Sequence, residues 1–301
     1  MPKISYTEKR FSSPSLAIIN QVNVIIDAYM AQGYKLTLRQ LYYRFIAQNL
    51  FPESWVDQVL GTKNTMRNYK HLGDIVNDGR LAGLIDWEAI EDRTRNVRSL
   101  AHWESPADIL KACASQYRID KWATQEIRPR VWIEKDALVG VIENVCNQHD
   151  VPYFSCRGYT SQSEMWAAAQ KIRQEVDAGF TPVILHLGDH DPSGLDMTRD
   201  ITDRIKLFMG GIEITRLALN SDQIQQYNPP PSPAKTTDSR SEAYIAEFGN
   251  DSWELDALEP QVIESLIEEA ILSFRDEEAW EKAVKKETAQ RKKILKISKT
   301  I

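Results

Sequence analysis

The spacing of hydrophobic and polar positions changes along the chain and predicts two different kinds of structure. Toward the N-terminus, apolar residues recur every three or four positions, which is typical of amphipathic helices. Further along, short continuous apolar runs bounded by Pro or Gly alternate with helical patterns. Such runs are typical of buried parallel strands with crossover helices between them. The pattern therefore predicts an α/β protein in which a helical N-terminal part precedes a mostly parallel sheet.

Helix-start and helix-stop residues give approximate bounds for these elements. Thr37 is a good N-cap for the second helix, and Gly33 is suited to close the first. The predicted N-terminal helices cover 14–32, 38–47 and 62–82. The predicted strands cover 130–134, 152–156, 183–187 and 212–219. Further helices are expected over 137–146, 164–176, 195–208 and 260–298.

The three N-terminal helices suit a winged-helix or helix-turn-helix unit, whose third helix enters the major groove of DNA. The front of the third predicted helix is basic, and Lys63, Arg67 and Lys70 are its candidate DNA-binding side chains. No β-wing can be placed from the pattern. A small helical bundle is therefore the alternative interpretation.

Three carboxylates follow two of the predicted strands. Glu134 ends the strand 130–134, while Asp189 and Asp191 come directly after the strand 183–187. Because ligands bind beyond the carboxyl ends of parallel strands, these side chains are expected to converge at one edge of the sheet. Carboxylates so placed repel one another unless a cation lies between them, and oxygen ligands alone suit Mg²⁺ or Mn²⁺. The alternative is a solvated turn in which the aspartates cap the next helix.

Arg39, Tyr42 and Tyr43 stand on one side of the second predicted helix, at positions i, i+3 and i+4. A cation beside a phenol favours the phenolate, and it can also hold a phosphate oxygen. The alternative is an amphipathic helix that uses Leu41, Tyr42 and Phe45 as core. Spacing alone favours this second interpretation.

Two motifs together resemble the topoisomerase VI A subunit and its relative, the meiotic double-strand-break protein. Trp132-Ile-Glu-Lys135 and Gly188-Asp-His-Asp-Pro-Ser-Gly194 are similar to the metal motif of that family's Toprim domain. Arg39-Gln-Leu-Tyr-Tyr43 is similar to the Arg-x-x-Tyr-Tyr that the family carries on a preceding winged-helix domain. The resemblance implies a winged-helix-like DNA-binding domain over 1–125. It also implies a Rossmann-like Toprim domain with C-terminal helices over 126–301.

The resemblance also implies an enzyme, a type IIB topoisomerase A subunit that cleaves and rejoins double-stranded DNA through a 5′-phosphotyrosyl intermediate. Tyr43 would be its nucleophile and Arg39 the electrostatic partner, while Glu134, Asp189 and Asp191 would bind Mg²⁺. A homodimer is expected, because in the family the tyrosine of one subunit works with the metal site of the other. The sequence contains no Walker-type loop, so ATP-driven strand passage would need a separate ATPase subunit.

Two other functions stay open at this point. One is a Toprim-type metal-dependent nuclease in which Tyr43 only packs, and the other is a DNA-binding module without chemistry. Arg157 falls at a strand end, where it could meet a phosphate near the metals. The segment Arg157-Gly-Tyr-Thr-Ser161 departs from topoisomerase VI, which has a Gly-and-Pro-Asp pattern followed by Arg in this region. The departure leaves the handling of phosphate beside the metals open.

Charge is distributed unevenly around a net value of −6. Residues 1–130 carry 18 Lys and Arg against 14 Asp and Glu, residues 131–281 carry 11 against 28, and residues 282–301 carry 8 against 1. An acidic middle between basic ends is a distribution that nucleic-acid enzymes with metal sites can have. The basic segment 291–296 is expected to be an exposed helix, with a DNA-backbone contact as the alternative.

Several other features limit the class of protein. No apolar run approaches the roughly 18–20 residues of a membrane span, and the N-terminus lacks the apolar core of a signal peptide. The cysteines have no Cys-x-x-Cys spacing, so we expect reduced thiols in a cytoplasmic, nucleoid-associated protein. Glu254 and Asp256 are the candidates for further acids of the site, although surface turns are the favoured interpretation. Arg93, Arg95 and Arg98 could follow DNA backbone or cover a domain junction.

Overall fold

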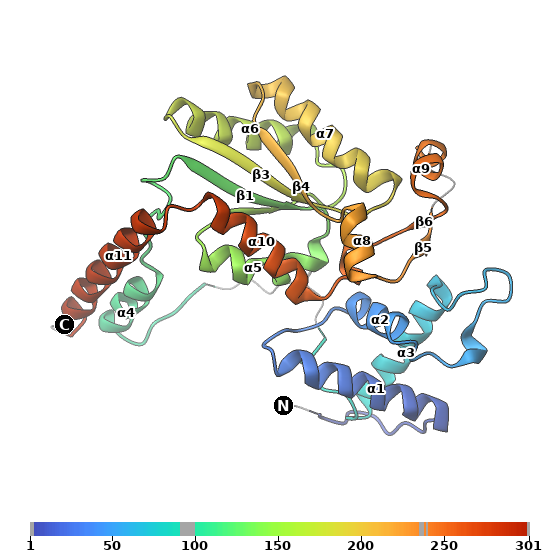
Figure 1. Ribbon diagram of the computed structural model, residues 1–301. Coiled ribbons are helices and arrows are strands. Elements are labelled where there is room, and N and C mark those ends of the chain that lie inside the picture. Colours follow the sequence, from blue (N-terminus) through green and yellow to red (C-terminus); the bar gives the residue numbers. More distant parts are fainter. Residues whose placement is uncertain (1–2, 91–99, 235–237, 239, 300–301) are drawn as a thin grey trace.

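The computed structural model describes residues 3–90, 100–234, 238 and 240–299. A unit of three helices lies at the N-terminal end, and a four-stranded sheet with helices on both faces forms the centre (Figure 1). A pair of helices at the far end of the sheet includes the C-terminal one (Figure 1). The structure thus confirms an α/β protein with a parallel sheet preceded by helices.

The N-terminal unit consists of α1 (Ser13–Met30), α2 (Leu38–Ala47) and α3 (Met66–Leu81), with a short 3-10 helix, η1 (Glu53–Trp55), between the last two. A capping box starts α2, because the Thr37 hydroxyl accepts from the Gln40 amide at 3.2 Å and the Gln40 side chain accepts from the Thr37 amide at 2.8 Å. Residues 48–65, all of them described, contain no β-strand. The unit therefore has no wing between α2 and α3.

The inward faces of these helices form one hydrophobic core. Residues three or four apart on α1 and α2 pack against the middle of α3 and the loop after it. Its fully buried members include Val22, Leu41, Phe45, Leu72 and Ile85. Tyr42 and Tyr43 also belong to this core, which agrees with the packing role that spacing predicts for α2.

The sheet contains β1 (Ile127–Ile133), β2 (Tyr153–Ser155), β3 (Thr181–Leu187) and β4 (Glu213–Ala218). All neighbours pair in parallel, in the order β2-β1-β3-β4. The side chains of β3 alternate between the two faces, so Leu185 and its neighbours two residues away enter one core and Ile184 enters the other. This two-sided burial explains why β3 reads as a continuous apolar run.

Helices cover both faces of the sheet (Figure 1). One face lies under α6 (Gln162–Asp177) and α7 (Pro192–Met209), which pack against each other. The other face lies under α5 (Val139–Gln148), which follows η2 (Asp136–Leu138), and under α10 (Pro260–Phe274). Each predicted strand and helix of this region is present with bounds shifted by a few residues, except that the helical stretch predicted over 260–298 is divided at residues 275–276 into two helices.

After β4 the chain forms smaller elements at the end of the sheet that faces the N-terminal unit (Figure 1). These are α8 (Ser221–Tyr227), β5 (Ser232–Pro233), α9 (Ser241–Phe248), β6 (Asp251–Ser252) and η3 (Leu255–Ala257). The strands β5 and β6 pair in antiparallel fashion. The short element η3 packs against α2, so this segment joins the sheet to the N-terminal unit.

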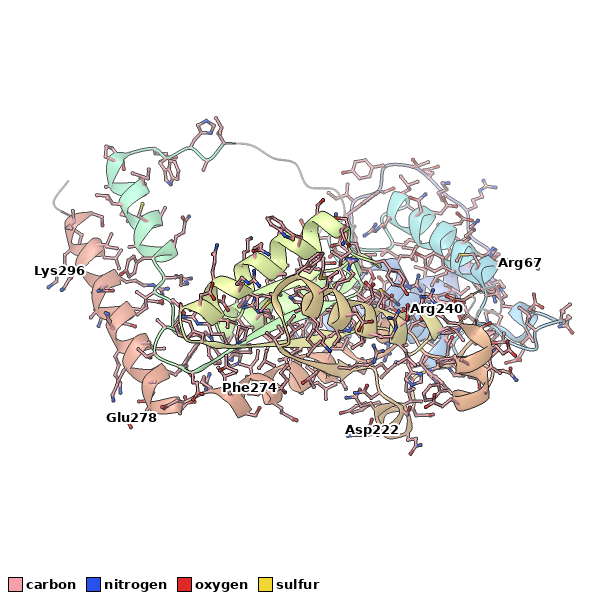
Figure 2. The ribbon with its side chains drawn as sticks, turned by 90° about the horizontal axis from the view of Figure 1, so that it is seen from above. Arg67, Asp222, Arg240, Phe274, Glu278 and Lys296 are labelled. Atoms are coloured by element: carbon pink, nitrogen blue, oxygen red, sulfur yellow. The ribbon has the colours of Figure 1, made fainter. Side chains whose placement is uncertain are left out.

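At the opposite end, α4 (Pro106–Gln116) packs against α11 (Glu277–Ile297) (Figures 1 and 2). The sequence-based boundary assigns α4 to the first domain, but the structure places it on the C-terminal helix. None of the helices in the described part of the chain combines the length and apolarity needed to cross a membrane.

We predict that Leu185→Ala lowers the free energy of unfolding by about 2–5 kcal/mol, because Leu185 is buried in the central strand and its loss leaves a cavity. Leu207→Ala is the matched control, since Leu207 is 72% exposed on α7 and should change stability by less than about 0.5 kcal/mol. Urea denaturation of both variants measures the difference. Equal effects would contradict the assigned core.

Candidate active site

The candidate site lies at the carboxyl ends of β1 and β3. The chain leaves β1 toward β2 on one side and leaves β3 toward β4 on the other, which makes this the switch point of the sheet. Glu134 follows β1 and Asp189 lies just beyond β3, and the Asp189 amide donates to Glu134 Oε2 at 3.0 Å. The predicted convergence of the two strand ends is therefore present.

The loop after β3 turns sharply into α7. Asp191 is the N-cap of α7 and accepts from the Gly194 amide at 2.6 Å, so the expected alternative of a helix cap also describes this residue. A Cβ on Gly194 would lie 2.2 Å from the Asp189 carbonyl oxygen, which explains why a glycine stands there. Arg216 on β4 donates to the Asp189 carbonyl at 2.5 Å and fixes the loop from the other side.

Lys135 is the central charge of the site. Its ammonium lies 2.8 Å from Asp189 Oδ1 and 3.1 Å from Asp256 Oδ1, and it also pairs with Glu254. Asp189 Oδ1 accepts a further hydrogen bond from the Leu255 amide at 2.7 Å. The Asp189 carboxylate, predicted as a metal ligand, is thus held by a cation of the protein itself.

Glu254 and Asp256 reach the site through a short stretch of backbone pairing. The amide of His190 donates to the Trp253 carbonyl at 2.8 Å, and the amide of Trp253 donates back at 2.9 Å. The residues that follow therefore run along the Asp189 loop. The expectation of surface turns is wrong for this segment, since Asp256 is 2% exposed and its carboxylate is enclosed by cations.

Arg39 extends the cluster into the N-terminal unit. Its guanidinium lies 2.7 Å from Glu254 Oε2 and 2.9 Å from Asp256 Oδ2, and its carbon lies 5.8 Å from the centre of the Tyr43 ring. Because α2 carries both Arg39 and Tyr43, the same contact that joins the two parts of the chain brings the candidate nucleophile to the sheet edge. The predicted pairing of Arg39 with Tyr43 is present.

The cluster keeps its cations charged. Burial alone would lower the pKa of Lys135, but the carboxylates of Asp256, Asp189 and Glu254 outweigh it and raise that pKa well above its usual value. Burial also acts to lower the pKa of Arg39, but Asp256 and Glu254 outweigh it and raise that pKa. In return, Lys135 and Arg39 overcome the effect of burial on Glu254 and lower its pKa to about 2.

Tyr43 is a neutral phenol in this arrangement. Burial raises its pKa, and the negative charges of Glu254 and Asp256 raise it further, while Arg39 and Lys135 act in the opposite direction without prevailing. Arg39 does lower the pKa of Tyr43, as the sequence predicts. Burial and the two carboxylates outweigh it, so the pKa of Tyr43 is raised. The Tyr43 side chain is almost fully buried, at 4% exposure.

Tyr42 has a structural environment. Its hydroxyl accepts from the Thr65 amide at 2.8 Å and lies 3.2 Å from Asn64 Oδ1. Its ring contacts Phe51 and Tyr69, and burial raises its pKa to about 12. These contacts fix the start of α3 on α2, which makes Tyr42 the packed neighbour of Tyr43.

Glu134 and Asp191 suit a hard cation. Burial raises the pKa of Glu134 and the nearby charge of Asp191 raises it further, although the Asp189 amide and Lys135 oppose this. A divalent cation bound between these two carboxylates would remove the repulsion between their charges. In the described part of the chain, no group of three His, Cys, Asp or Glu side chains is arranged as a metal site. Asp189 is the third candidate ligand, and one of its carboxylate oxygens, Oδ1, already contacts Lys135 and the Leu255 amide.

The predicted DNA-binding residues have different environments. Lys63 is tied down by Glu53 at 2.5 Å and by the Phe51 carbonyl at 2.8 Å, so it fixes the loop before α3. Arg67 and Lys70 are exposed on α3. Arg157 is 75% exposed in its side chain and lies 3.2 Å from Asp136. The remaining basic candidates, Arg93, Arg95 and Arg98, lie outside the described residues.

Sequence reasoning gave no role to Lys135 or Arg216 and placed Glu254 and Asp256 at the surface. Arg216 had a signal, since it is the one cation of a short strand whose neighbouring positions Ile214, Leu217 and Ala218 are apolar. The alternation of Glu254 and Asp256 with apolar residues was a further signal of partial burial. No family model, curated protein or solved structure matches this chain. Its function must therefore be inferred from the chemistry of the site.

We predict that acid destabilises the native protein more than it destabilises Glu254→Gln. The folded-state pKa of Glu254, about 2, lies below its ordinary value of 4.5, so the unfolded chain binds a proton first as the pH falls. The ionised Glu254 carboxylate therefore stabilises the folded state above pH 4.5, and this stabilisation is lost as the pH falls toward the folded-state pKa of about 2. Urea denaturation between about pH 5 and pH 2.5 should give a difference on the order of 1–3 kcal/mol.

The control for this comparison is Glu247→Gln, at an exposed position on α9. It should follow the native pH dependence. If Glu254→Gln also lost stability with the same slope as the native chain, the Lys135–Glu254–Arg39 pairing would be incorrect.

Proposed function

We propose that the protein cleaves double-stranded DNA in the manner of a topoisomerase VI A subunit, with Tyr43 as nucleophile and a divalent metal ion as cofactor. One observation carries this proposal. Residues from four separate parts of the chain, 39–43, 134–135, 189–191 and 254–256, meet in one charged cluster at the switch point of the sheet. The cluster brings Arg39 and Tyr43 of α2 beside the carboxyl ends of β1 and β3.

The chain's own residues supply most of the expected chemistry. The Tyr43 oxygen would form a bond to phosphorus while the bond from phosphorus to the 3′ oxygen breaks in line. The phenol proton would leave to Glu254 or Asp256 after the phosphate has displaced these carboxylates from Arg39, because a paired Glu254 with a pKa of about 2 is too weak a base. The departing 3′ oxygen takes a proton from water and becomes a free hydroxyl. Arg39 and Lys135 would face the phosphate charge.

Glu134 and Asp191 would hold a Mg²⁺ or Mn²⁺ ion. When bound, the ion would supply a Lewis acid for the phosphate and the leaving oxygen. In this proposal Asp189 serves mainly to place Lys135 through Oδ1, and a role as third ligand would fall to its other carboxylate oxygen.

A homodimer and a separate ATPase subunit belong to the same proposal. Two chains related by a two-fold axis would match the symmetry of duplex DNA and cut both strands. The exposed Arg67 and Lys70 on α3 are the candidates for contact with the duplex near each tyrosine. Strand passage would be driven by the partner subunit.

A second candidate function is a metal-dependent nuclease without covalent tyrosine chemistry. The burial of Tyr43 and the raised pKa of its hydroxyl favour it, because both make the phenol a weaker nucleophile. In that case water would replace Tyr43, and the cluster around Lys135 would only position the phosphate.

We predict that Tyr43→Phe loses cleavage of supercoiled DNA and formation of a protein-linked 5′ end by about three orders of magnitude or more. The substitution removes one oxygen and keeps the ring in the core. Tyr42→Phe is the matched control. It loses a structural hydrogen bond worth about 1 kcal/mol and should retain most of the activity.

The measurement uses end-labelled DNA with Mg²⁺ or Mn²⁺, followed by denaturation and detection of protein on the ends. Undiminished cleavage by Tyr43→Phe, with no protein on the ends of either form, would establish the nuclease. Absence of cleavage by every form would refute both enzymatic proposals.

We also predict that Asp191→Asn weakens Mg²⁺ binding at least about tenfold, because it removes one of two anionic oxygen donors. Asn is a good N-cap, so α7 should keep its start. Asp203→Asn, on the exposed side of the same helix, is the control and should bind Mg²⁺ like the native chain. Calorimetric titration measures both, and equal affinities for the two variants would exclude Asp191 as a ligand.

A further inference from the structure

The C-terminal helix α11 carries its positive charge on one side. Successive residues of an α-helix are rotated by about 100°, which places six of its lysines within an arc of about 120°. The six residues are Lys282, Lys285, Lys286, Lys292, Lys293 and Lys296. The remaining basic residue of the helix, Arg291, points to the opposite side, where its Nε donates to the Tyr117 carbonyl at 2.8 Å.

The opposite side of α11 is the packed side. Glu287 is buried there and accepts from the Ile119 amide at 3.0 Å, and Lys121 lies 3.2 Å from the same carboxylate. Tyr117 donates to the Gln290 side chain at 2.6 Å. These contacts fix the rotation of α11 against α4 and the segment after it, so that all six lysines are held outward and exposed. The expectation of an exposed basic helix is therefore correct.

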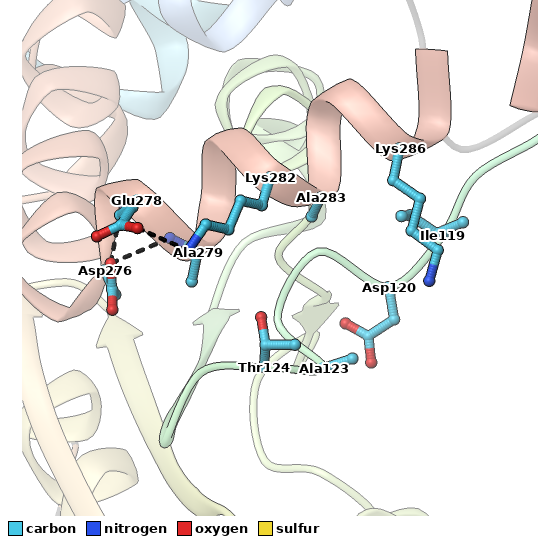
Figure 3. Close-up of a pocket in the computed structure, with 10 residues that line it drawn as sticks. All are labelled: Ile119, Asp120, Ala123, Thr124, Asp276, Glu278, Ala279, Lys282, Ala283 and Lys286. Atoms are coloured by element: carbon cyan, nitrogen blue, oxygen red, sulfur yellow. Dashed lines mark hydrogen bonds and ion pairs between the residues drawn. The ribbon is translucent and has the colours of Figure 1, made fainter. Parts of the chain in front are cut away.

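The two halves of this lysine face differ. In the first half, Lys282 pairs with Glu278 at 2.6 Å and Lys285 pairs with Glu281 at 2.9 Å. Lys282 and Lys286 also border a cavity of about 560 Å³ between α11 and residues 119–124 (Figure 3). The carboxylates of Asp120, Asp276 and Glu278 line the same cavity. This half therefore carries both signs of charge and does not select for an anion.

The second half is purely cationic. Lys292, Lys293 and Lys296 have no ion pair with any residue that the structure describes, and each is exposed. Figure 2 shows Lys296 at the end of the molecule away from Arg67 of α3. Lys296 complements the negative end of the helix dipole in the last turn of α11, but no carboxylate of the described residues neutralises any of the three charges.

We propose that the end of α11 binds the phosphate backbone of duplex DNA as a second contact, remote from the candidate active site. This inference rests on the proposed function for the identity of the polyanion. All the charges on the face are Lys, which is a flexible point charge suited to phosphate, and none is Arg, which reads guanine edges bidentately. From Lys292 to Lys296 the helix is about 6 Å long, a length of duplex that carries roughly three to four phosphates.

The contact also explains the uneven charge of the chain. Residues 131–281 carry 28 acidic against 11 basic residues, and such a surface repels DNA wherever it is not covered by cations. The basic end of α11 gives the duplex a cationic contact that this acidic part does not offer. The duplex would then be held at α3 and at α11, on opposite ends of the molecule.

The test is the salt dependence of duplex DNA binding by the full chain, measured by fluorescence anisotropy in EDTA so that no cleavage occurs. The triple substitution Lys292→Gln, Lys293→Gln and Lys296→Gln should reduce the slope of log affinity against log salt by about 2.7, since each lost phosphate contact removes about 0.9. The control triple, Lys171→Gln, Arg173→Gln and Lys206→Gln, makes the same charge change on exposed positions of α6 and α7. It should change the slope by less than about 1.

Each outcome decides between defined possibilities. If the native chain binds DNA and the triple substitution on α11 leaves the salt slope unchanged, this inference is overturned. The proposed function is then unaffected. Equal loss in both triples means that only net charge matters, and it also overturns the inference. An unchanged slope together with loss of the dimer in sedimentation assigns the face to a second copy of the chain. A native chain that binds no duplex DNA refutes the inference and the proposed function together.

Discussion

The candidate site depends on the ion pairs that the buried ammonium of Lys135 forms with three carboxylates. The ammonium lies among Asp189 from the loop after β3 and Glu254 and Asp256 from the segment after β6. Uncompensated carboxylates at this depth would each cost several kcal/mol, and their repulsion would separate the segments that carry them. Arg39 adds the second cation from α2. The candidate site and the contact between the two parts of the chain are therefore one structure.

Much of the fold follows from local patterns that the sequence makes visible. The capping box of α2 needs only Thr37 and Gln40, and the helix begins where these residues predict. The strand β3 reads as an apolar run because the two cores on either side of the sheet bury its alternate residues. The meeting of Glu134 with the Asp189 loop could also be predicted, because parallel neighbouring strands bring their carboxyl ends together.

The remaining features depend on contacts between distant segments, which single-sequence patterns do not encode. Glu254 and Asp256 look like turn residues until the backbone pairing of His190 with Trp253 carries them into the interior. The placement of α4 on α11, and not on the N-terminal helices, depends on the fit of two helix faces. The net rise in the pKa of Tyr43 likewise requires knowing which charges surround it, because Arg39 alone would lower that pKa.

The engagement of Arg39 by two carboxylates has a consequence for how any polyanion can enter the site. The guanidinium already has Glu254 at 2.7 Å from Nη2 and Asp256 at 2.9 Å from Nε, so a phosphate that binds through these two nitrogens replaces an existing anion and does not fill an empty position. Entry at this point is an ion exchange. The affinity of the site for phosphate is then set by how much more strongly Arg39 attracts the phosphate than it attracts Glu254 and Asp256. The released carboxylates are left beside Tyr43, where they can accept its proton.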